Sequence, residues 1–333
     1  MFKKTTGAIV LSAVAALTGT TAIADGHAIT VGYFLEWPMP FQFAKVNGTY
    51  EEALEMEINW VSFDTGTAMS AAMASGDVQL SVSQGVPPFV VATSAGQDLQ
   101  MLDVAVSYAD NDNCVVRSDL EITAMSAADL AGSKVAVPLG TAAHYGFLRQ
   151  MDHFDVDVAS LDVVDMSPPD GAAALAQGAV DMACGWGGSL RRMKESGNTL
   201  LTGDEKTALG ILVFDVTSAP TAWVAENEAT VAKFLAVTAQ ANAMWKAGDM
   251  IDEMLPVIAQ DSGMDVEATA QTLATFVFPS VEEQLGAAWL GAAAPSFLQG
   301  VAQVFVDAGS IDGSLDSYAG AINTGPLAAA NDM

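Results

Sequence analysis

A carboxylate within an apolar run is the first candidate for chemistry in this sequence. Asp215 lies in ILVFDVTSAP, which otherwise has the pattern of a buried strand. Burying an ionised carboxylate is costly unless a partner compensates its charge. Two explanations stay open: Asp215 accepts hydrogen bonds from backbone N–H groups at a strand end, or it is the counter-ion of a ligand's ammonium group. Glu36, beside Trp37 in the loop EWPMP, could meet the same cation.

The segment PLGTAAHYGFL, residues 138–148, could hold an anion. It predicts a strand end, a Gly-Thr turn and a helix that begins at about Ala142. The free N–H groups and the dipole of a helix start attract negative charge. Thr141 adds a hydroxyl group, and Ala142 is small enough to let a ligand reach the backbone. His144 and Tyr145 follow, and the sequence leaves open whether they face a cleft or pack into the core.

A second turn of this kind belongs to a repeated segment. AAMASGDVQLSVSQG (71–85) returns as AALAQGAVDMACGWG (173–187), with identical residues at six of 15 positions. Each copy predicts a helix end, a buried strand and a loop. Ligands of open parallel sheets bind beyond the carboxyl ends of the strands. We therefore expect the two copies to face one cleft, with Gln84 as a hydrogen-bond donor beside Gly85 and with Trp186 opposite. Trp37 and Trp186 could form aromatic walls around the methylene groups or the cation of a ligand.

Residues for catalysis or metal binding are sparse. The three histidines are His27, His144 and His153, and the last two are nine positions apart, too far for a helical metal pair. The chain has no Gly-rich phosphate loop with Lys-Ser/Thr and no nucleophile elbow. We therefore expect that the protein is not an enzyme, has no catalytic residue and binds no metal or cofactor. The two cysteines, Cys114 and Cys184, either form a disulfide or are separate buried thiols.

Strand-like and helix-like segments alternate along the chain, which predicts an α/β fold with mostly parallel sheets covered on both faces. One unit covers about 28–108. A second covers about 114–214 and ends with a strand at 210–216, and segments beyond about Glu226 look helical. We therefore expect two lobes, with residues 25–110 plus 216–333 forming lobe I and residues 111–215 forming lobe II.

The N-terminus predicts export. Residues 1–24 combine Lys3 and Lys4 with a short apolar run and the small-residue ending Ala22-Ile23-Ala24, as in a signal peptide cleaved near Ala24. The net charge of −28 becomes −30 once the two lysines are removed. Such an acidic chain repels nucleic acid and favours a ligand of zero or positive net charge. Adaptation of the surface to salty surroundings is the other explanation. The cations of SLRRMKE (189–195) are expected on a solvated helix face.

The order of five segments resembles a known family. FDTGTAMSAAMASGDVQL, VPLGTAAHYGFL, PPDGAAALAQGAVDMACGW, LVFDV and FPSVEEQL follow one another as in the periplasmic taurine-binding proteins of ABC importers, within the wider family of sulfonate, nitrate and thiamine-precursor binding proteins. The resemblance implies a two-lobed (type II, Venus-flytrap) binding protein with a helical C-terminal segment. It implies a periplasmic monomer that captures taurine in its cleft and delivers it to a membrane permease.

The resemblance also implies roles for single residues. The sulfonate is expected at Gln84, Gly85 and Val86 and at Thr141, Ala142 and Ala143; the aromatic position falls on Trp186, and the amine partner on Asp215. This chain has Gln-Gly where its relatives have Ser-Ser, and alanines where they have hydroxyls before His144. Fewer side-chain donors would hold the anion, so other ligands stay open: an alkanesulfonate, N-acetyltaurine or a betaine-like solute. An exported sensory module is a further alternative.

Overall fold

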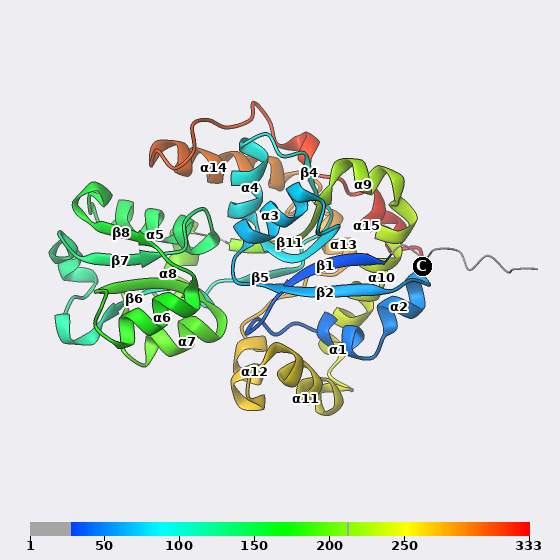
Figure 1. The fold of residues 1–333 in the computed structure, drawn as a ribbon, viewed down its shortest axis with the longest axis horizontal. Coiled ribbons are helices and arrows are strands. Elements are labelled where there is room, and N and C mark those ends of the chain that lie inside the picture. Colours follow the sequence, from blue (N-terminus) through cyan, green and yellow to red (C-terminus); the bar gives the residue numbers. More distant parts are fainter. Residues whose placement is uncertain (1–27, 212) are drawn as a thin grey trace, which may run out of the picture.

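The computed structural model describes residues 28–211 and 213–333, and Figure 1 shows two β-sheets side by side, each with its own helices. The predicted signal peptide and His27 lie outside the described residues. We call the sheets and the helices packed on them the first and second lobes. None of the helices in the described ranges combines the length and the hydropathy needed to span a membrane.

The first sheet has the strand order β2-β1-β3-β11-β4, and β5 also pairs with β11. Its strands are β1 (Ile29–Phe34), β2 (Ile58–Phe63), β3 (Leu80–Gly85), β4 (Leu99–Met101), β5 (Val106–Tyr108) and β11 (Val213–Pro220). The strands β2, β1 and β3 are parallel, whereas β11 is antiparallel to its neighbours. The strand predicted at 210–216 therefore belongs to the first sheet and not to the second unit.

The second sheet has the order β10-β6-β9-β7-β8. Its strands are β6 (Asp112–Arg117), β7 (Lys134–Val137), β8 (Asp162–Asp165), β9 (Met182–Trp186) and β10 (Gly197–Thr199). The central pairs β7·β8 and β7·β9 are parallel, and β6 is antiparallel to β9 and β10. The α/β class is confirmed, but both sheets are mixed, because the strands β6 and β11 follow the two chain crossings between the lobes.

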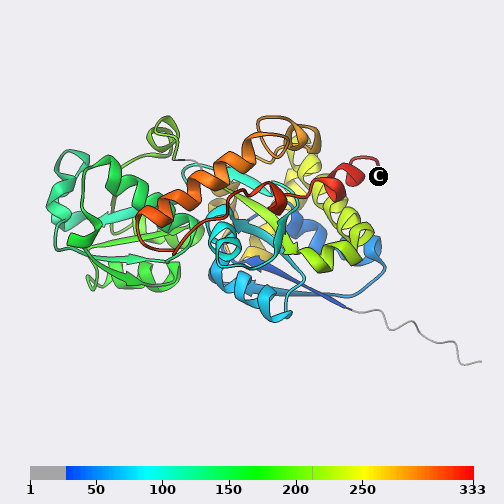
Figure 2. The same cartoon turned by 90° about the horizontal axis from the view of Figure 1, so that it is seen from above.

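The helices follow the strands in alternation and then form the C-terminal part. They are α1 (Phe41–Val46), α2 (Thr49–Leu54), α3 (Gly66–Ser75), α4 (Val86–Ser94), α5 (Ala142–His153), α6 (Pro168–Ala176), α7 (Gly187–Lys194), α8 (Gly203–Ala208), α9 (Thr221–Glu226), α10 (Glu228–Ala247), α11 (Ile251–Ser262), α12 (Val266–Leu273), α13 (Val281–Leu285), α14 (Ala293–Asp307) and α15 (Gly325–Ala330). Helix α14 contacts both α4 and α5 and so bridges the lobes (Figure 2).

Local sequence signals place the helices next to the cleft. Thr65 caps α3 by accepting a hydrogen bond from the N–H of Ala68, and α3 ends at Gly76, which has a φ of 84°. Two prolines occupy the first turn of α4, where missing N–H groups are tolerated. Thr141 caps α5. These signals fix where the three helices begin, and therefore where their N-termini point.

Two features of the second lobe adjoin the crossing segments. Lys206 is buried, and its ammonium group donates hydrogen bonds to the carbonyl oxygens of Ala109 and Asp112, at the passage from β5 to β6. Cys114 and Cys184 form a disulfide between the paired strands β6 and β9, which resolves the alternative left open by the sequence. The lobe boundaries at 110/111 and 215/216 remain predictions, although the second falls inside β11, which lies wholly in the first sheet.

Candidate functional site

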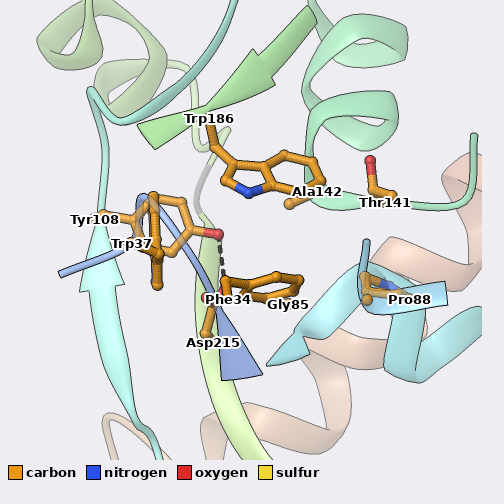
Figure 3. Close-up of a pocket in the computed structure, with 10 residues that line it drawn as sticks. Phe34, Trp37, Gly85, Pro88, Tyr108, Thr141, Ala142, Trp186 and Asp215 are labelled. Atoms are coloured by element: carbon orange, nitrogen blue, oxygen red, sulfur yellow. Dashed lines mark hydrogen bonds between the residues drawn. The ribbon is translucent and has the colours of Figure 1, made fainter. Parts of the chain in front are cut away.

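A small cavity lies between the two lobes, beyond the carboxyl ends of β1, β3 and β9 (Figure 3). The first lobe contributes Phe34, Trp37, Gly66, Gly85, Pro88, Tyr108 and Asp215, and the second lobe contributes Thr141, Ala142 and Trp186. The cavity volume is about 20 Å³, enough for about one water molecule. A larger ligand therefore requires the walls to move apart.

The two lobes approach each other at Gly85. A Cβ atom placed on this glycine would lie 3.5 Å from the Cβ of Ala142 and 3.5 Å from Oδ1 of Asp215. The loop after β3, the start of α5 and the strand β11 thus converge on one point. Small residues at positions 85 and 142 leave the backbone accessible from the cavity.

Asp215 is 3% exposed and lines the cavity. Its Oδ1 accepts a hydrogen bond of 2.7 Å from the hydroxyl of Tyr108, and its Oδ2 accepts one of 2.7 Å from the hydroxyl of Ser83. Within the described ranges, no lysine or arginine forms an ion pair with it. Burial raises the pKa of Asp215 to about 7, although the two hydroxyls lower it; the charge of Asp112 adds to the increase. The carboxylate therefore lacks a cation partner.

Ser83 connects this carboxylate to an aromatic cluster. The indole N–H of Trp37 donates to the Ser83 hydroxyl at 2.8 Å, and that hydroxyl donates to Asp215. Trp37 packs against Tyr108 and Phe276, with ring centroids 4.9 and 4.6 Å apart. Ser83 has a φ of 62°, which is uncommon for a residue with a side chain and marks backbone strain at this site.

Three helix N-termini reach the cavity, and that of α4 lies directly beside Asp215. They are those of α3 at Gly66, of α4 at Gly85 and of α5 at Thr141 and Ala142. Thr141 Oγ1 donates to the carbonyl of Pro138 at 2.6 Å and accepts from the N–H of His144 at 3.4 Å. The partial positive charge of converging helix starts favours an anion. The cavity therefore combines a buried carboxylate with the positive ends of helix dipoles.

The side chain of Gln84 does not lie in this cavity, contrary to prediction. It is fully buried, and its amide nitrogen donates to the carbonyl of Gly66 and to Ser70, at 2.9 and 2.6 Å. Its oxygen accepts from Ser218 at 2.6 Å. Gln84 therefore ties α3 to β3 and β11. Its neighbour Gly85 lines the cavity instead, because successive residues of a strand point to opposite faces.

His144 and Tyr145 are also outside the cavity lining. His144 Nδ1 accepts from the N–H of Gly140 at 3.1 Å, and its ring packs on Phe305 of α14. Burial lowers the pKa of His144 to about 4, so the imidazole is neutral near pH 7. The Tyr145 hydroxyl accepts from Arg149 at 3.1 Å. Both side chains pack into the protein, which resolves the alternative left open by the sequence.

Glu36 pairs with an arginine and not with the cavity. Its carboxylate forms an ion pair with Arg192 on α7, including one hydrogen bond of 2.9 Å, and lies 3.4 Å from the Ser189 hydroxyl. Its carbonyl accepts from the N–H of Gly188 at 3.2 Å. A side chain on Gly187 would collide with that carbonyl. Glu36 thus connects the two lobes, and one cation of SLRRMKE lies in this contact, contrary to the solvated face expected.

Several cavity residues were not predicted from sequence. They are Phe34, Gly66, Pro88 and Tyr108, together with Ser83 behind Asp215. Phe34 and Tyr108 are the last residues of β1 and β5. The strand-end rule that indicated Trp186 would also have indicated these two. Among the described residues, no group of three or more His, Cys, Asp or Glu side chains is arranged to hold a metal ion.

The sequence of this chain is similar to those of known proteins. Residues 39–247 match the family described as "NMT1/THI5 like". The taurine-binding periplasmic protein of Escherichia coli (strain K12) is 27% identical over 177 residues, which cover 53% of this chain and 54% of that protein. The chain thus spans about half the length of this curated relative.

Two solved structures share the fold. The periplasmic aliphatic sulphonate binding protein SsuA from Escherichia coli superposes with a TM-score of 0.68 at 22% identity, covering 87% of this chain and 90% of that one. The desulfurization enzyme DSZB superposes with a TM-score of 0.63 at 16% identity, covering 91% and 99%. One fold thus carries binding and catalysis, and the fold alone does not decide between them. Because the family match covers more than half of the sequence, the chain belongs to the NMT1/THI5-like family.

Proposed function

We propose that this protein is an extracytoplasmic solute-binding protein of an ABC importer and that its ligand is taurine, 2-aminoethanesulfonate. The sulfonate would lie at the helix N-termini near Gly85, Thr141 and Ala142, and the ammonium group would meet Asp215. The predicted signal peptide and the periplasmic relative support an exported, periplasmic protein. Its partner would be a membrane permease, to which it delivers the ligand as a monomer.

The single observation that carries this proposal is a buried carboxylate, without a cation partner in the part of the chain that the structure describes, in one cavity with three helix starts. A buried charge costs several kcal/mol unless a partner compensates it. Burial is the main cause of the raised pKa of Asp215, and a bound cation would lower that pKa. A molecule with a positive and a negative end satisfies the carboxylate and the helix starts at once. Since taurine has no net charge, the net charge of −28 does not repel it over long distances.

Other functions predict different ligands or reactive groups. A plain alkanesulfonate would use the helix starts but leave Asp215 without a partner. A carboxylate betaine or N-acetyltaurine would alter one end of the ligand. An enzyme would need a reactive cluster, and the cavity lining contains neither cysteine nor histidine. A sensory module would bind the same ligands but pass its signal to a receptor, and neighbouring permease and ATPase genes would argue against it.

Calorimetric titration with taurine, hypotaurine, N-acetyltaurine, ethanesulfonate and glycine betaine tests the proposal. We expect taurine to bind at least tenfold more tightly than ethanesulfonate. Asp215→Ala should lose roughly 2–4 kcal/mol of taurine binding. Asp103→Asn is the matched control: Asp103 is buried and accepts from the N–H of Thr217, but it does not line the cavity. Equal binding of taurine and ethanesulfonate, or unchanged affinity in Asp215→Ala, would remove the proposed role of Asp215.

A further inference from the structure

Four aromatic side chains line the cavity around the carboxylate. We call Phe34, Trp37, Tyr108 and Trp186 the aromatic wall; Figure 3 shows their rings around the space next to Asp215. The first three are 6%, 2% and 7% exposed. The centroids of Phe34 and Trp186 are 6.0 Å apart. Three members come from the first lobe and Trp186 from the second, so closure of the lobes completes the wall.

Oxygen acceptors are few near Asp215. Among the described residues that line the cavity, oxygen is carried by the side chains of Asp215, Tyr108 and Thr141, and the Thr141 hydroxyl already donates to the carbonyl of Pro138. Each oxygen of Asp215 already accepts one hydroxyl hydrogen bond and keeps about one further acceptor site. Of the nearby groups outside these side chains, the Gly66 carbonyl accepts from Gln84, and the Ser83 hydroxyl lies between Trp37 and Asp215. A primary ammonium group has three N–H donors. An ammonium group at this place would therefore contact mainly aromatic carbon atoms and few hydrogen-bond acceptors.

We propose that this site recognises N-methylated ammonium groups at least as well as primary ones, so that its ligand class is taurine together with its N-methylated derivatives. This inference rests on the proposed function, because it takes the sulfonate as the other end of the ligand. Each methyl group removes an N–H that would otherwise need an acceptor, and it spreads the positive charge over an apolar surface. Aromatic faces attract such cations without hydrogen bonds. Asp215 supplies the opposite charge.

The surroundings provide space for methyl groups. A groove of about 390 Å³ adjoins the cavity and shares Phe34 and Trp186 with it. These two side chains separate the cavity from the groove. Movement of Trp186 away from Phe34 would join the cavity to this groove. Substituents on nitrogen would gain room there.

A ligand series with a constant sulfonate tests this recognition. Taurine and its N-methyl, N,N-dimethyl and N,N,N-trimethyl derivatives would be titrated calorimetrically into the full-length mature protein at pH 8. We expect the dimethyl and trimethyl compounds to bind as tightly as taurine or more tightly. If both bind more than threefold more weakly than taurine, the inference is overturned while the proposed function stands. If no member of the series binds but glycine betaine does, the sulfonate of the proposed function is wrong and the recognition of methylated cations stands.

Variants of the aromatic wall separate recognition from folding. Trp186→Leu and Phe34→Leu should weaken the trimethyl compound about tenfold and taurine less than threefold, because the loss of an aromatic face affects the methylated cation more. Trp223→Leu on α9 is the matched control, since Trp223 does not line the cavity. The ratio of the two affinities does not change if a variant merely reduces the amount of folded protein. Equal losses for both ligands would contradict recognition by the wall.

Discussion

Lowering the pH from 8 to 5 is expected to weaken taurine binding through protonation of Asp215. Burial raises the pKa of this carboxyl group to about 7. The bound ammonium group favours the ionised form, so taurine must displace the proton when Asp215 carries one. An alkylamine remains protonated over this range and keeps its own charge. Affinity should therefore fall as the pH drops below 7 and be nearly constant above it.

The magnitude follows from the fraction of Asp215 that is ionised. With a pKa of about 7, the apparent Kd is multiplied by about 1.1 at pH 8, about 2 at pH 7, about 11 at pH 6 and about 100 at pH 5. The loss between pH 8 and pH 6 is thus about tenfold, or about 1.4 kcal/mol. At pH 6, binding should release about 0.9 proton per taurine.

Calorimetry at four pH values in two buffers of different ionisation enthalpy measures both quantities. Tyr108 stays protonated over this range because burial raises its pKa well above its usual value. Burial also raises the pKa of Asp112 to about 7, and its charge acts on Asp215, so Asp112→Asn should shift the midpoint slightly and keep the profile. Asp215→Asn should bind weakly with no pH dependence. A wild-type affinity that is constant from pH 8 to 5, without proton release, would refute the reasoning.

Three further predictions concern stability and closure. The pKa of Asp215 is higher in the folded than in the unfolded protein, so its contribution to stability is present below about pH 4 and lost as the pH rises through about 7. Without ligand, Asp215→Asn should therefore be more stable than the wild type at pH 8, by at most about 4 kcal/mol. Urea unfolding measures this difference. Replacing both Cys114 and Cys184 by serine should lower the free energy of unfolding by about 4 kcal/mol, since the bridge closes a loop with a sequence separation of 70; reductant without effect on the wild type would contradict this. Gly187→Ala should weaken taurine binding more than Arg192→Gln does. The added methyl group collides with the carbonyl of Glu36, whereas Arg192→Gln removes a half-exposed ion pair worth about 1 kcal/mol or less. If calorimetry gives the reverse order, the ion pair dominates closure.

Residues whose position follows from local rules were predictable from the sequence. The Gly-Thr turn before α5 predicted Thr141 and Ala142, and the repeated helix–strand segment predicted Trp186 together with Gln84, one position away from the Gly85 that lines the cavity. Asp215 was conspicuous because a carboxylate interrupts an apolar strand. Each of these inferences needs only the strand-end rule or the cost of a buried charge.

The remaining site residues depend on information that a single sequence does not contain. Gln84 and Gly85 are neighbours, and only the face of β3 that meets the cavity decides between them. Glu36 looked free because its partner Arg192 is 156 positions away. The strand at 213–220 looked like the end of the second unit, but its antiparallel pairing with β3 places it in the first sheet. Pairing partners and side-chain directions are tertiary facts.

The carboxylate and the helix starts of the cavity differ in which lobe supplies them. Asp215, Ser83 and Tyr108 all belong to the first lobe, whereas the helix starts come from α3 and α4 of the first lobe and from α5 of the second. The proposed ion pair with Asp215 is thus complete before the lobes meet, and closure adds only Trp186 around the cation, while the sulfonate contact is completed only when α5 approaches. A ligand shifts an equilibrium between open and closed forms only by binding one form better than the other. The anion should therefore drive closure, and the cation should decide which ligands enter. An alkanesulfonate would then close the protein with low affinity, whereas a simple amine would bind the first lobe without closing it.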